Sequence, residues 1–515
     1  MIRIWKNPEL VRHLRAELRT TRALTIAAVV LVIALLIWLG CWGSRASEME
    51  ALRRASAQFG RPSAERLAEM ERQSPMEVWF DFYRIFMYAQ LGILTFWSLF
   101  SCAQSISGER ERKTWDFQRA TRLTAWELLS GKLLGEPVVA YFIVLCCLPV
   151  ALSAGLLGRA GVANIAEAYL LIISAALFIG LAGLWLSSLF ESRSRGVGLI
   201  GTFGLYLLFA FVSQAGESNF PGMAALSPLA GFVPLFKGGY LRRPTIFGSP
   251  VPWAVMSLLL YVTFGAWLVL MLLRTLTKDY EQMRPLSRWQ TVGCAAFLNF
   301  TIYALYFPRT LTAWDPFTKF IVAINGAILF AMGLAMLRSH ERLKVWWRTR
   351  GETRWPAFAE DGPQWPWLAL SAAVGYGLLL WGLFAWKNAL GLEPAAFRMG
   401  LLEFAVVLIF ITRDITFIQW CRLTRMRAPV LKGVLFAGLY YVAAIVLSTV
   451  VLVYSEARGQ DIYALLTPVG EFQPAPSNPH YAMWGLIGMG VQLAVIVFLQ
   501  TTIMARLQRT VAEAV

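Results

Sequence analysis

The sequence contains little charge and almost no histidine. Only 15% of its residues are Asp, Glu, Lys or Arg, and the three histidines, His13, His340 and His480, lie far apart, so no metal site is indicated. Cysteine is scarce as well. Four of the six cysteines fall within apolar runs, namely Cys102, Cys146, Cys147 and Cys294. Few cysteines can therefore meet outside an apolar segment, and no disulfide framework is expected.

Apolar residues are abundant and are gathered into long runs. They make up 57% of the chain, and the mean hydropathy is +0.55. The runs are about 20 residues long, which is the length that crosses a bilayer core as a helix. They also lack the alternation of barrel strands, so each is expected to be a helix. The sequence therefore predicts an all-α, polytopic membrane protein.

We predict about twelve membrane-spanning helices. They are Ala23–Trp42, Ile85–Ile106, Leu134–Leu157, Ala166–Phe190, Val197–Ser213, Val251–Leu273, Trp289–Phe307, Phe317–Leu337, Trp367–Trp386, Met399–Phe417, Leu431–Tyr454 and Tyr481–Met504. The first run is too long for a removable signal peptide and no A-x-A-like cleavage site closes it, so it is expected to remain as a span.

The distribution of Lys and Arg predicts the orientation. With the amino terminus inside, most of these residues fall in cytoplasmic segments, so both termini are expected on the cytoplasmic side of the membrane. The membrane is expected to be a prokaryotic cytoplasmic (inner) membrane. The basic external segment 43–75 also carries five glutamates and is interpreted as a solvated helical hairpin. The net charge of +16 is spread over many short loops, which favours anionic lipid headgroups over nucleic acid as the partner.

Residues 1–22 precede the first span and predict a cytoplasmic amphipathic helix from Asn7 to Arg22. Asn7 is expected to cap it, with Pro8 in its first turn. An apolar face and a basic face follow, formed by Leu10, Val11, Leu14 and Leu18 and by Arg12, Arg15, Arg19 and Arg22. Such a helix lies in the headgroup layer. Two roles are open for it: a simple basic anchor, or a helix that also contacts a cytoplasmic partner.

A dense charged loop, Ser107 to Pro137, separates the second and third spans. We expect a first short helix from Glu109 to Arg119 that presents aromatic side chains among charges, a combination typical of protein contacts. A second helix should begin at Thr124, because Thr124 and Glu127 have the spacing of a capping box.

This loop resembles that of the permease subunits of ATP-binding-cassette exporters of the type-2 membrane-domain class. Their loop reads like E-R-E-x-G-T-L-E, followed by T-P-L-S-x-x-E-L-L-x-G-K-L-L. The residues that match are Glu109, Arg110, Glu111 and Thr114, and then Thr121, Leu123, Glu127, Leu128, Leu129, Gly131, Lys132, Leu133 and Leu134. Lys113 stands where the family has Gly and Arg122 where it has Pro, which affects the expected turn geometry.

The resemblance covers roughly the first 275 residues. It implies a six-span exporter-type membrane domain at 23–275, a coupling loop at 107–132 that contacts a separately encoded ATPase, and an external re-entrant segment at 214–250. The implied ATPase-contact residues are Glu109, Arg110, Glu111, Arg112, Lys113, Thr114, Trp115, Arg122, Glu127 and Lys132. A solvated turn without a partner is the alternative. Phosphate binding by 107–114 is disfavoured, because Ser107 and Arg112 occupy the glycine positions of a P-loop.

Residues 276–515 resemble a degenerate repeat of the first half with six further spans. Ser339 to Trp346 echoes Ser107 to Trp115, and Leu466-Thr-Pro-Val469 echoes Leu226-Ser-Pro-Leu229. A competing register pairs Arg422-Leu-Thr424 with Arg122-Leu-Thr124, so the repeat is one of two interpretations.

Among the ionisable residues within or next to spans, Glu403 is the candidate for a transport pathway, while Arg413 and Asp414 are assigned a structural role. Taken together, the chain is predicted to be a non-enzymatic ABC exporter permease without a cofactor of its own, with ATP bound by its partner and a second permease chain as a further partner. An ion-coupled secondary transporter and a polytopic membrane enzyme are the alternatives. Loop acids available to such an enzyme are Glu360, Asp361, Glu456, Asp461 and Glu471.

Overall fold

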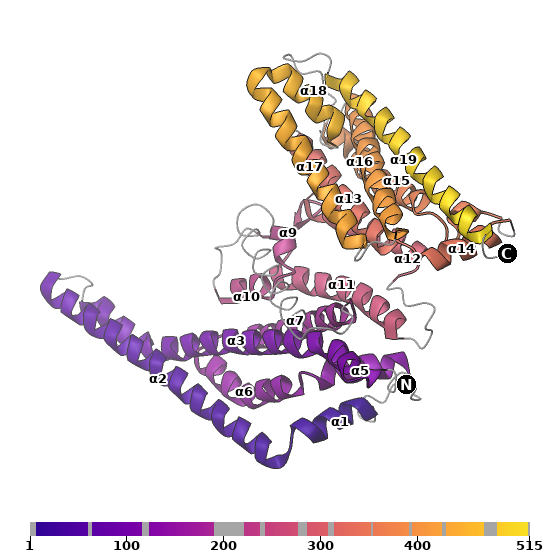
Figure 1. The fold of residues 1–515 in the computed structure, drawn as a ribbon. Coiled ribbons are helices and arrows are strands. Elements are labelled where there is room, and N and C mark those ends of the chain that lie inside the picture. The colour runs from indigo at the N-terminus through magenta and orange to yellow at the C-terminus, as the bar shows by residue number, and fades with distance from the viewer. Residues whose placement is uncertain are drawn as a thin grey trace. The chain divides into compact units, whose positions relative to one another are not determined.

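The computed structural model describes residues 7–59, 64–115, 123–189, 221–236, 243–276, 286–306, 314–351, 354–390, 394–424, 429–467 and 481–512. These residues are almost entirely helical, with one short hairpin of β1 (Thr245–Ile246) and β2 (Ser249–Pro250). The chain forms two compact units. Unit 1 comprises residues 1–245 and 249–285, and unit 2 comprises residues 246–248 and 286–515. Each is described by itself (Figure 1).

Unit 1 contains an amino-terminal helix and a bundle of apolar helices. Its helices are α1 (Pro8–Glu17), α2 (Thr20–Phe59), α3 (Ala64–Glu111), α5 (Ala125–Gly135), α6 (Val138–Leu157), α7 (Val162–Leu189), α9 (Pro221–Ala224), α10 (Pro228–Phe236) and α11 (Trp253–Leu276). The predicted amphipathic helix is shorter than expected, because α1 ends at Glu17 and Leu18 leaves the helical conformation. The predicted extension to Arg22 is therefore wrong, and Arg22 belongs to α2.

The first two long helices extend well beyond the rest of unit 1. Helix α2 has 40 residues, which corresponds to about 60 Å, twice the thickness of a bilayer core. Figure 1 shows α2 and α3 approaching each other at their far ends, beyond α6 and α7. The part that extends includes the segment predicted as an external helical hairpin at 43–75, and its described residues are helical.

A large core holds most of the helices of unit 1 together. It is built from side chains of α2, α3, α6, α7, α10 and α11. Phe232 of α10 is completely buried and lies against the rings of Tyr88 and Phe236. Gly231 lets α10 approach α11, because a Cβ at this position would lie 2.4 Å from Oγ of Ser257. Helix α10, in the predicted re-entrant segment, is thus packed into the bundle, and residues 214–220 and 237–242 of that segment lie outside the described ranges.

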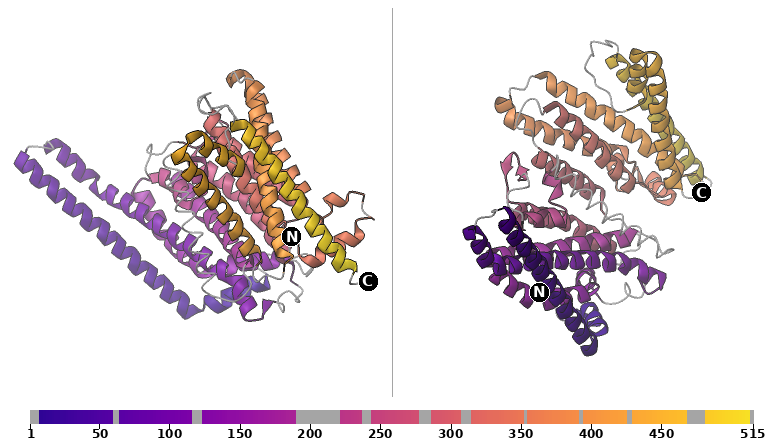
Figure 2. Two further views of the ribbon diagram at one scale, coloured as in Figure 1. Left: turned by 45° about the horizontal axis from the view of Figure 1, so that its top comes forward. Right: turned by 90° about the vertical axis from the view of Figure 1, so that its left-hand side faces the viewer.

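Unit 2 is a second helical bundle. Its elements are α12 (Arg288–Tyr306), α13 (Trp314–Ala335), α14 (His340–Thr349), a short 3₁₀ helix at Pro356–Phe358, α15 (Trp365–Leu390), α16 (Pro394–Arg422), α17 (Pro429–Tyr454), α18 (Glu456–Leu466) and α19 (Tyr481–Ala512). Figure 2 gives two further views in which α19 runs along its bundle to the carboxyl terminus. Helix α14 turns away from α13 by 85°.

Seven described helices are long and apolar enough to cross a membrane, or eight if α13 and α14 together form one span. The protein is therefore an all-α polytopic membrane protein. Of the twelve predicted spans, Val197–Ser213 lies outside the described residues. Three others, Trp289–Phe307, Trp367–Trp386 and Met399–Phe417, coincide largely with α12, α15 and α16, which are helical without being among the seven.

The packing partners follow the same order in both units. In unit 1, α7 packs against α3 and α11, α6 packs against α2 and α3, and α10 packs against α11. In unit 2, α16 packs against α13 and α19, α15 packs against α12 and α13, and α18 packs against α19. The repeat itself stays a prediction. The two units differ in one detail: α10 begins at Pro228, within Leu226-Ser-Pro-Leu229, whereas α18 ends at Leu466, the first residue of Leu466-Thr-Pro-Val469.

Candidate functional site

The charged loop of unit 1 begins with a tight turn at the end of α3. The amide of Thr114 donates to the carbonyl of Glu109 over 3.0 Å, and the amide of Lys113 donates to the carbonyl of Arg110 over 3.1 Å. This pair of bonds is the Schellman pattern that ends helices at a left-handed residue, here Lys113 with φ of 58°. The predicted separate helix Glu109–Arg119 is therefore wrong in its first part, because Glu109–Glu111 are the last turn of α3.

The second helix of the loop begins as predicted. Thr124 caps α5: its hydroxyl accepts from the amide of Glu127 over 3.2 Å, and Glu127 Oε2 accepts from the amide of Thr124 over 2.9 Å. The backbone and side-chain hydrogen bonds from Thr124 lower the pKa of the Glu127 carboxyl below its ordinary value. The capping box is thus confirmed, and it holds the start of α5 with its glutamate ionised.

Helix α1 packs directly on α5. The Asn7 side chain caps α1 by accepting from the amide of Glu9 over 3.0 Å, as predicted. Its amide nitrogen also donates to the carbonyl of Glu127 over 2.6 Å. The two helices approach closely at two glycines, since a Cβ at Gly131 would lie 2.6 Å from Cβ of Glu9 and one at Gly135 would lie 2.8 Å from the His13 ring. The amino-terminal helix is therefore seated on the loop of its own chain.

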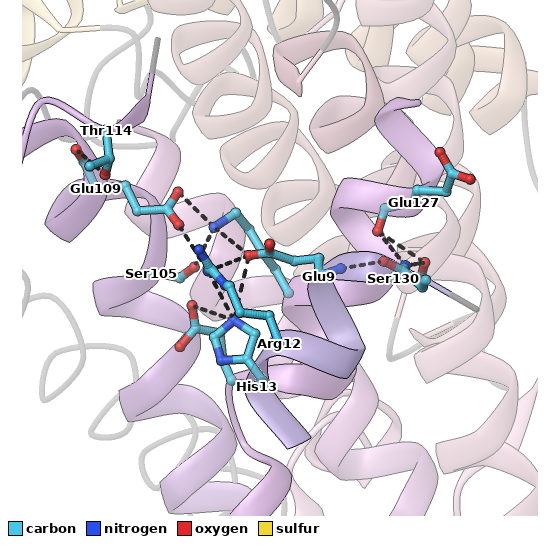
Figure 3. A network of polar contacts seen from close by, with 11 residues as sticks. Glu9, Arg12, His13, Ser105, Glu109, Thr114, Glu127 and Ser130 are labelled. Carbon is cyan, nitrogen blue, oxygen red and sulfur yellow. Dashed lines mark hydrogen bonds and ion pairs between the residues drawn. The ribbon is translucent and has the colours of Figure 1, made fainter. Parts of the chain in front are cut away.

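A buried lysine joins three helices. Lys132 of α5 is 0% exposed, and its Nζ lies 2.7 Å from Oε2 of Glu109 on α3 and 3.9 Å from Oε1 of Glu9 on α1. The same ammonium donates to Oγ of Ser105 over 3.2 Å. Arg12 completes the cluster at 2.6 Å from Glu9 and 3.8 Å from Glu109. Figure 3 shows the side chains of Glu9, Arg12 and Glu109 converging in this network.

The network determines the ionisation of Glu9. Burial alone would raise the pKa of this carboxyl. The hydrogen bond from His13 and the charges of Lys132 and Arg12 lower it by more than burial raises it, so the pKa of Glu9 lies below the ordinary value. Glu9 and Glu109 thus share the buried Lys132 as their ion-pair partner. Breaking such a buried pair on one side leaves an uncompensated charge, which costs about 3–5 kcal/mol.

Trp115 is buried rather than presented to solvent. Its exposure is 4%, and it lies in an apolar cluster with residues of α3, α5, α7 and α11. The Lys132 ammonium and the Arg110 guanidinium each lie 5.9 Å from the centroid of its ring. Arg110 also donates to the carbonyl of Ser188 in α7 over 3.1 Å. Trp115 and Lys132 thus tie the loop to the helices beneath it.

The predicted contact residues consequently divide into two groups. The first group faces the interior: Trp115 and Lys132 are buried, and Glu109 and Arg110 are partly buried. The second group is exposed and comprises Glu111, Arg112, Lys113 and Thr114. Glu127 is partly buried at the start of α5, and Arg122 lies outside the described residues. The sequence reasoning placed both groups on one contact surface, but burial lets only the exposed group contact a partner without rearrangement.

Trp126 was missed by the sequence reasoning. It is 49% exposed, in contrast to the buried Leu128, Leu129 and Lys132 of the same helix. An aromatic residue off the buried face of a helix was the signal that could have identified it, because exposed tryptophans are enriched at protein contacts. We call Glu111, Arg112, Lys113, Thr114 and Trp126 the loop-1 rim.

The corresponding loop of unit 2 carries a different polar core. Arg338 lies at the end of α13, where its backbone amide and carbonyl bond the Gln419 side chain over 2.9 Å each. Its guanidinium donates to the carbonyl of Glu360 over 3.0 Å. Arg288, at the start of α12, is 1% exposed and donates to the carbonyls of Pro363 and Gly362 over 2.7 and 2.6 Å. Both buried arginines thus fasten the loop mainly through backbone acceptors.

Two charged residues within a long helix of unit 2, Arg413 and Asp414 of α16, form an ion pair with each other. Arg413 lies 2.6 Å from Asp414 and donates to Gln492 over 2.7 Å, and Tyr441 donates to Asp414 over 2.6 Å. Glu403 is partly buried on α16. Within the described ranges, no group of three or more His, Cys, Asp or Glu is arranged to hold a metal ion. All six cysteines are free.

One of three comparisons with known proteins found a match. Residues 8–230 match the family model described as ABC-2 type transporter. The match covers α1, the long hairpin, the whole charged loop and the start of α10. No match was found among curated proteins or among solved structures.

Proposed function

Because residues 8–230 form the membrane domain of an ABC-2 type transporter, a permease component, we propose that the chain is the transmembrane subunit of an ATP-driven exporter. In this proposal a separately encoded ATPase docks on the loop-1 rim and supplies ATP binding and hydrolysis. The chain itself moves substrate across the cytoplasmic membrane, with both termini in the cytoplasm.

The observation that carries the proposal is the mechanical connection of the rim to the membrane helices. The rim residues Arg112 to Thr114 form the turn that directly ends α3, a helix of 48 residues. Glu109 in the last turn is ion-paired to the buried Lys132 of α5. A displacement of the rim therefore moves α3 and α5 together, because separating them would leave buried charges unpaired.

Helix α1 is a third part of this moving body. Its Glu9 contacts Lys132, and its backbone is closely packed on Gly131 and Gly135. The helix leads at once into α2, which begins at Thr20. Motion of the loop would thereby reach three long helices. These are α3, which ends at the loop, α2, which follows α1, and α6, which follows α5. We propose this joint motion as the coupling between ATP hydrolysis and the opening of the pathway.

The exposed rim has the chemistry of a protein contact. Glu111, Arg112 and Lys113 expose both signs of charge at the end of α3, and α5 exposes the indole of Trp126. Mixed charges determine register, and a tryptophan supplies most of the buried area at such contacts. We further propose that unit 2 supplies the second half of the pathway, where Glu403 is a candidate pathway residue, or that a second permease chain does so.

The test is co-purification from the native membrane. The detergent-solubilised chain is isolated, its partners are identified by mass spectrometry, and ATP hydrolysis is assayed on the eluate. We expect a subunit with nucleotide-binding motifs. With the variant Arg112→Glu plus Trp126→Ala, the amount of co-purified nucleotide-binding subunit should fall about tenfold or more, which is the effect of losing two central contacts.

The matched control is Arg53→Glu with Met70→Ala on the α2–α3 hairpin, which also reverses one exposed arginine and removes one exposed apolar side chain. It should leave the ATPase bound. Equal recovery from both variants would contradict docking at the rim, and a chain that purifies alone and is indifferent to ATP would contradict the exporter proposal itself.

A further inference from the structure

The loop of unit 2 exposes a surface that differs from the loop-1 rim. Helix α14 lies across the end of the bundle, where Leu343 packs with Ile503 and Leu507 of α19. Beyond it, residues 354–365 return to α15. The exposed residues in this region and at the adjacent helix ends are mainly arginines and aromatics: Arg348, Arg350, Arg354, Arg506, Arg509, Trp289, Trp355, Phe358 and Trp365. We call this surface the arginine–tryptophan collar.

The aromatic members are unusually accessible. Trp355 is 67% exposed, Trp289 is 65% exposed and Trp365 is 46% exposed. Trp289 and Trp365 stand at the first turns of α12 and α15. Tryptophans at the ends of membrane helices lie at the headgroup level, where the indole is partly in contact with acyl chains and its N–H reaches polar groups. The collar is therefore at headgroup depth.

The direction of α14 also indicates that this region lies at the depth of the headgroups. The axis of α14 is bent by 85° from that of α13. If α13 crosses the bilayer, α14 consequently runs along the membrane plane, as interfacial helices do. Its apolar residues Leu343 and Trp346 are buried against the bundle. Its outer side carries Val345 and Arg348, both of which are exposed.

The positive charge of the collar favours a negatively charged ligand. Among the described residues of this region, the acids are already engaged: Glu341 lies 3.3 Å from Lys344, Asp361 lies 3.4 Å from Arg342, and Glu360 contacts the buried Arg338. The guanidinium of Arg350 lies 3.5 Å from the centroid of the Trp347 ring, which keeps this cation at the surface. Exposed arginines with their neighbouring acids in use attract phosphate groups, which guanidinium binds bidentately.

The collar also has a fixed shape before any ligand binds. Arg288 holds the carbonyls of Gly362 and Pro363, and Trp346 donates to the carbonyl of Pro356 over 2.8 Å. The loop that carries Trp355 and Phe358 is thus pinned at both sides. A pre-shaped site loses less conformational freedom on binding than a mobile loop would.

From these observations we propose that the arginine–tryptophan collar of unit 2 is a binding surface for the headgroups of anionic phospholipids. Arg348 and Arg354 contact the phosphates, and Trp289, Trp355 and Trp365 lie among the glycerol and upper acyl groups. With the predicted orientation, the collar faces the cytoplasmic leaflet, where anionic lipids concentrate. This assignment is independent of the ATPase docking proposed for unit 1. In unit 2, the loop would anchor the bundle to lipid where unit 1 would bind protein.

Photo-cross-linking of lipid to the purified full chain tests the proposal. The chain is placed in phosphatidylcholine nanodiscs that contain a small share of photoactivatable phosphatidylglycerol, or of photoactivatable phosphatidylcholine in a parallel sample. The labelled peptides are then quantified by mass spectrometry. We expect phosphatidylglycerol to label residues 345–365 several-fold more than phosphatidylcholine does. Arg348→Gln with Arg354→Gln should remove most of that preference, because each cation at a membrane surface contributes about a fivefold effect and two together contribute about 25-fold.

A matched control removes two arginines elsewhere. Arg53 and Arg54 are exposed on the α2–α3 hairpin, so Arg53→Gln with Arg54→Gln should leave the labelling of 345–365 unchanged. Equal labelling by the two lipids, or labelling that the Arg348 and Arg354 substitutions leave intact, would overturn the proposal. It would equally be overturned if those substitutions released a bound protein while lipid labelling persisted, since the collar would then be a protein surface.

Discussion

In unit 1 the loop after α3 buries a lysine between two carboxylates, whereas in unit 2 the loop after α13 buries two arginines against backbone carbonyls. Lys132 reaches Glu109 and Glu9, which come from two other helices. Arg288 reaches the carbonyls of Gly362 and Pro363. The first arrangement joins three helices by charge, and the second fixes one loop in place. Similar helix packing therefore carries two kinds of loop.

The exposed sides of the two loops also differ, in the sign of the charges that they carry. The loop-1 rim contains Glu111, Arg112 and Lys113, which carry both signs of charge, and one exposed tryptophan, Trp126. The arginine–tryptophan collar carries an excess of cations beside several exposed aromatics. The comparison suggests a division of labour within the chain, in which unit 1 transmits force from a protein partner and unit 2 holds to the bilayer.

The largest expected effect comes from removing the buried lysine. Lys132→Met leaves the Glu9 and Glu109 carboxylates without their shared partner, so the free energy of unfolding of the solubilised chain should fall by about 3–5 kcal/mol. Thermal unfolding measures the loss. Adding Glu109→Gln to this variant should restore part of the stability, because it removes one of the unpaired charges. An unchanged unfolding temperature in Lys132→Met would contradict the ion-pair account.

The equivalent change in unit 2 should separate stability from coupling. Arg288→Met loses two charge-assisted hydrogen bonds to carbonyls, and we expect a loss of about 2–3 kcal/mol. ATPase recovery per folded chain should remain that of the unaltered protein, whereas Lys132→Met should reduce it. If Arg288→Met reduced ATPase recovery as strongly, the proposed difference between the two loops would not hold.

A smaller effect is expected where α1 sits on α5. Gly131→Ala places a Cβ at 2.6 Å from Cβ of Glu9, so α1 must shift, at a cost of about 1–3 kcal/mol. Gly108→Ala is the matched control, since its helical position has nothing within 4 Å of the added Cβ. Hydrogen exchange of the α1 amides is the measurement. Equal protection of α1 in both variants would show that close packing on α5 is not what holds α1.

Acid should loosen the same contact. The pKa of Glu9 is lower in the folded chain than its ordinary value of 4.5, so its contribution is complete above that pH and disappears as the pH falls through the folded pKa. Protection of the α1 amides, corrected for intrinsic exchange, should decrease in this acid range. Glu9→Gln should abolish that dependence, and a pH response that survives the substitution would assign it to another group.

The smallest expected effect concerns the turn at the end of α3. Lys113 adopts a left-handed conformation with φ of 58°, which glycine adopts without steric cost. Lys113→Gly should therefore raise the free energy of unfolding by about 0.5–1 kcal/mol. Thermal unfolding measures it, with Arg112→Gly as the control that should destabilise. A loss of stability in Lys113→Gly would mean that the lysine side chain makes a compensating contact.

Local signals in the sequence predicted local structure well. The caps at Asn7 and Thr124 have short-range patterns and were confirmed, and continuous apolar runs identified the long helices. The turn at Lys113 was mispredicted because its signal in the resembling family is a glycine, which this chain replaces. The sequence pattern could not reveal that the left-handed conformation persists without it.

Long-range burial was beyond local reasoning. Lys132 and Trp115 were predicted as partner contacts because charged and aromatic loop residues are usually exposed or at interfaces. Their burial depends on Glu9, which is 123 residues away from Lys132, and on side chains of α7 and α11. No spacing rule connects such positions. The same limitation hid the exposure of Trp126, which depends on the face that α5 turns toward the bundle.

Site-specific cross-linking in native membranes tests the central claim most directly. Thr114→Cys on the loop-1 rim and Val345→Cys on α14 each introduce one exposed thiol into a chain whose six cysteines are buried or partly buried. Reaction with a short thiol-reactive cross-linker is followed by identification of the adducts. The account predicts an adduct with a nucleotide-binding subunit from position 114 and none from position 345. A nucleotide-binding subunit joined at 345 but not at 114 would contradict it.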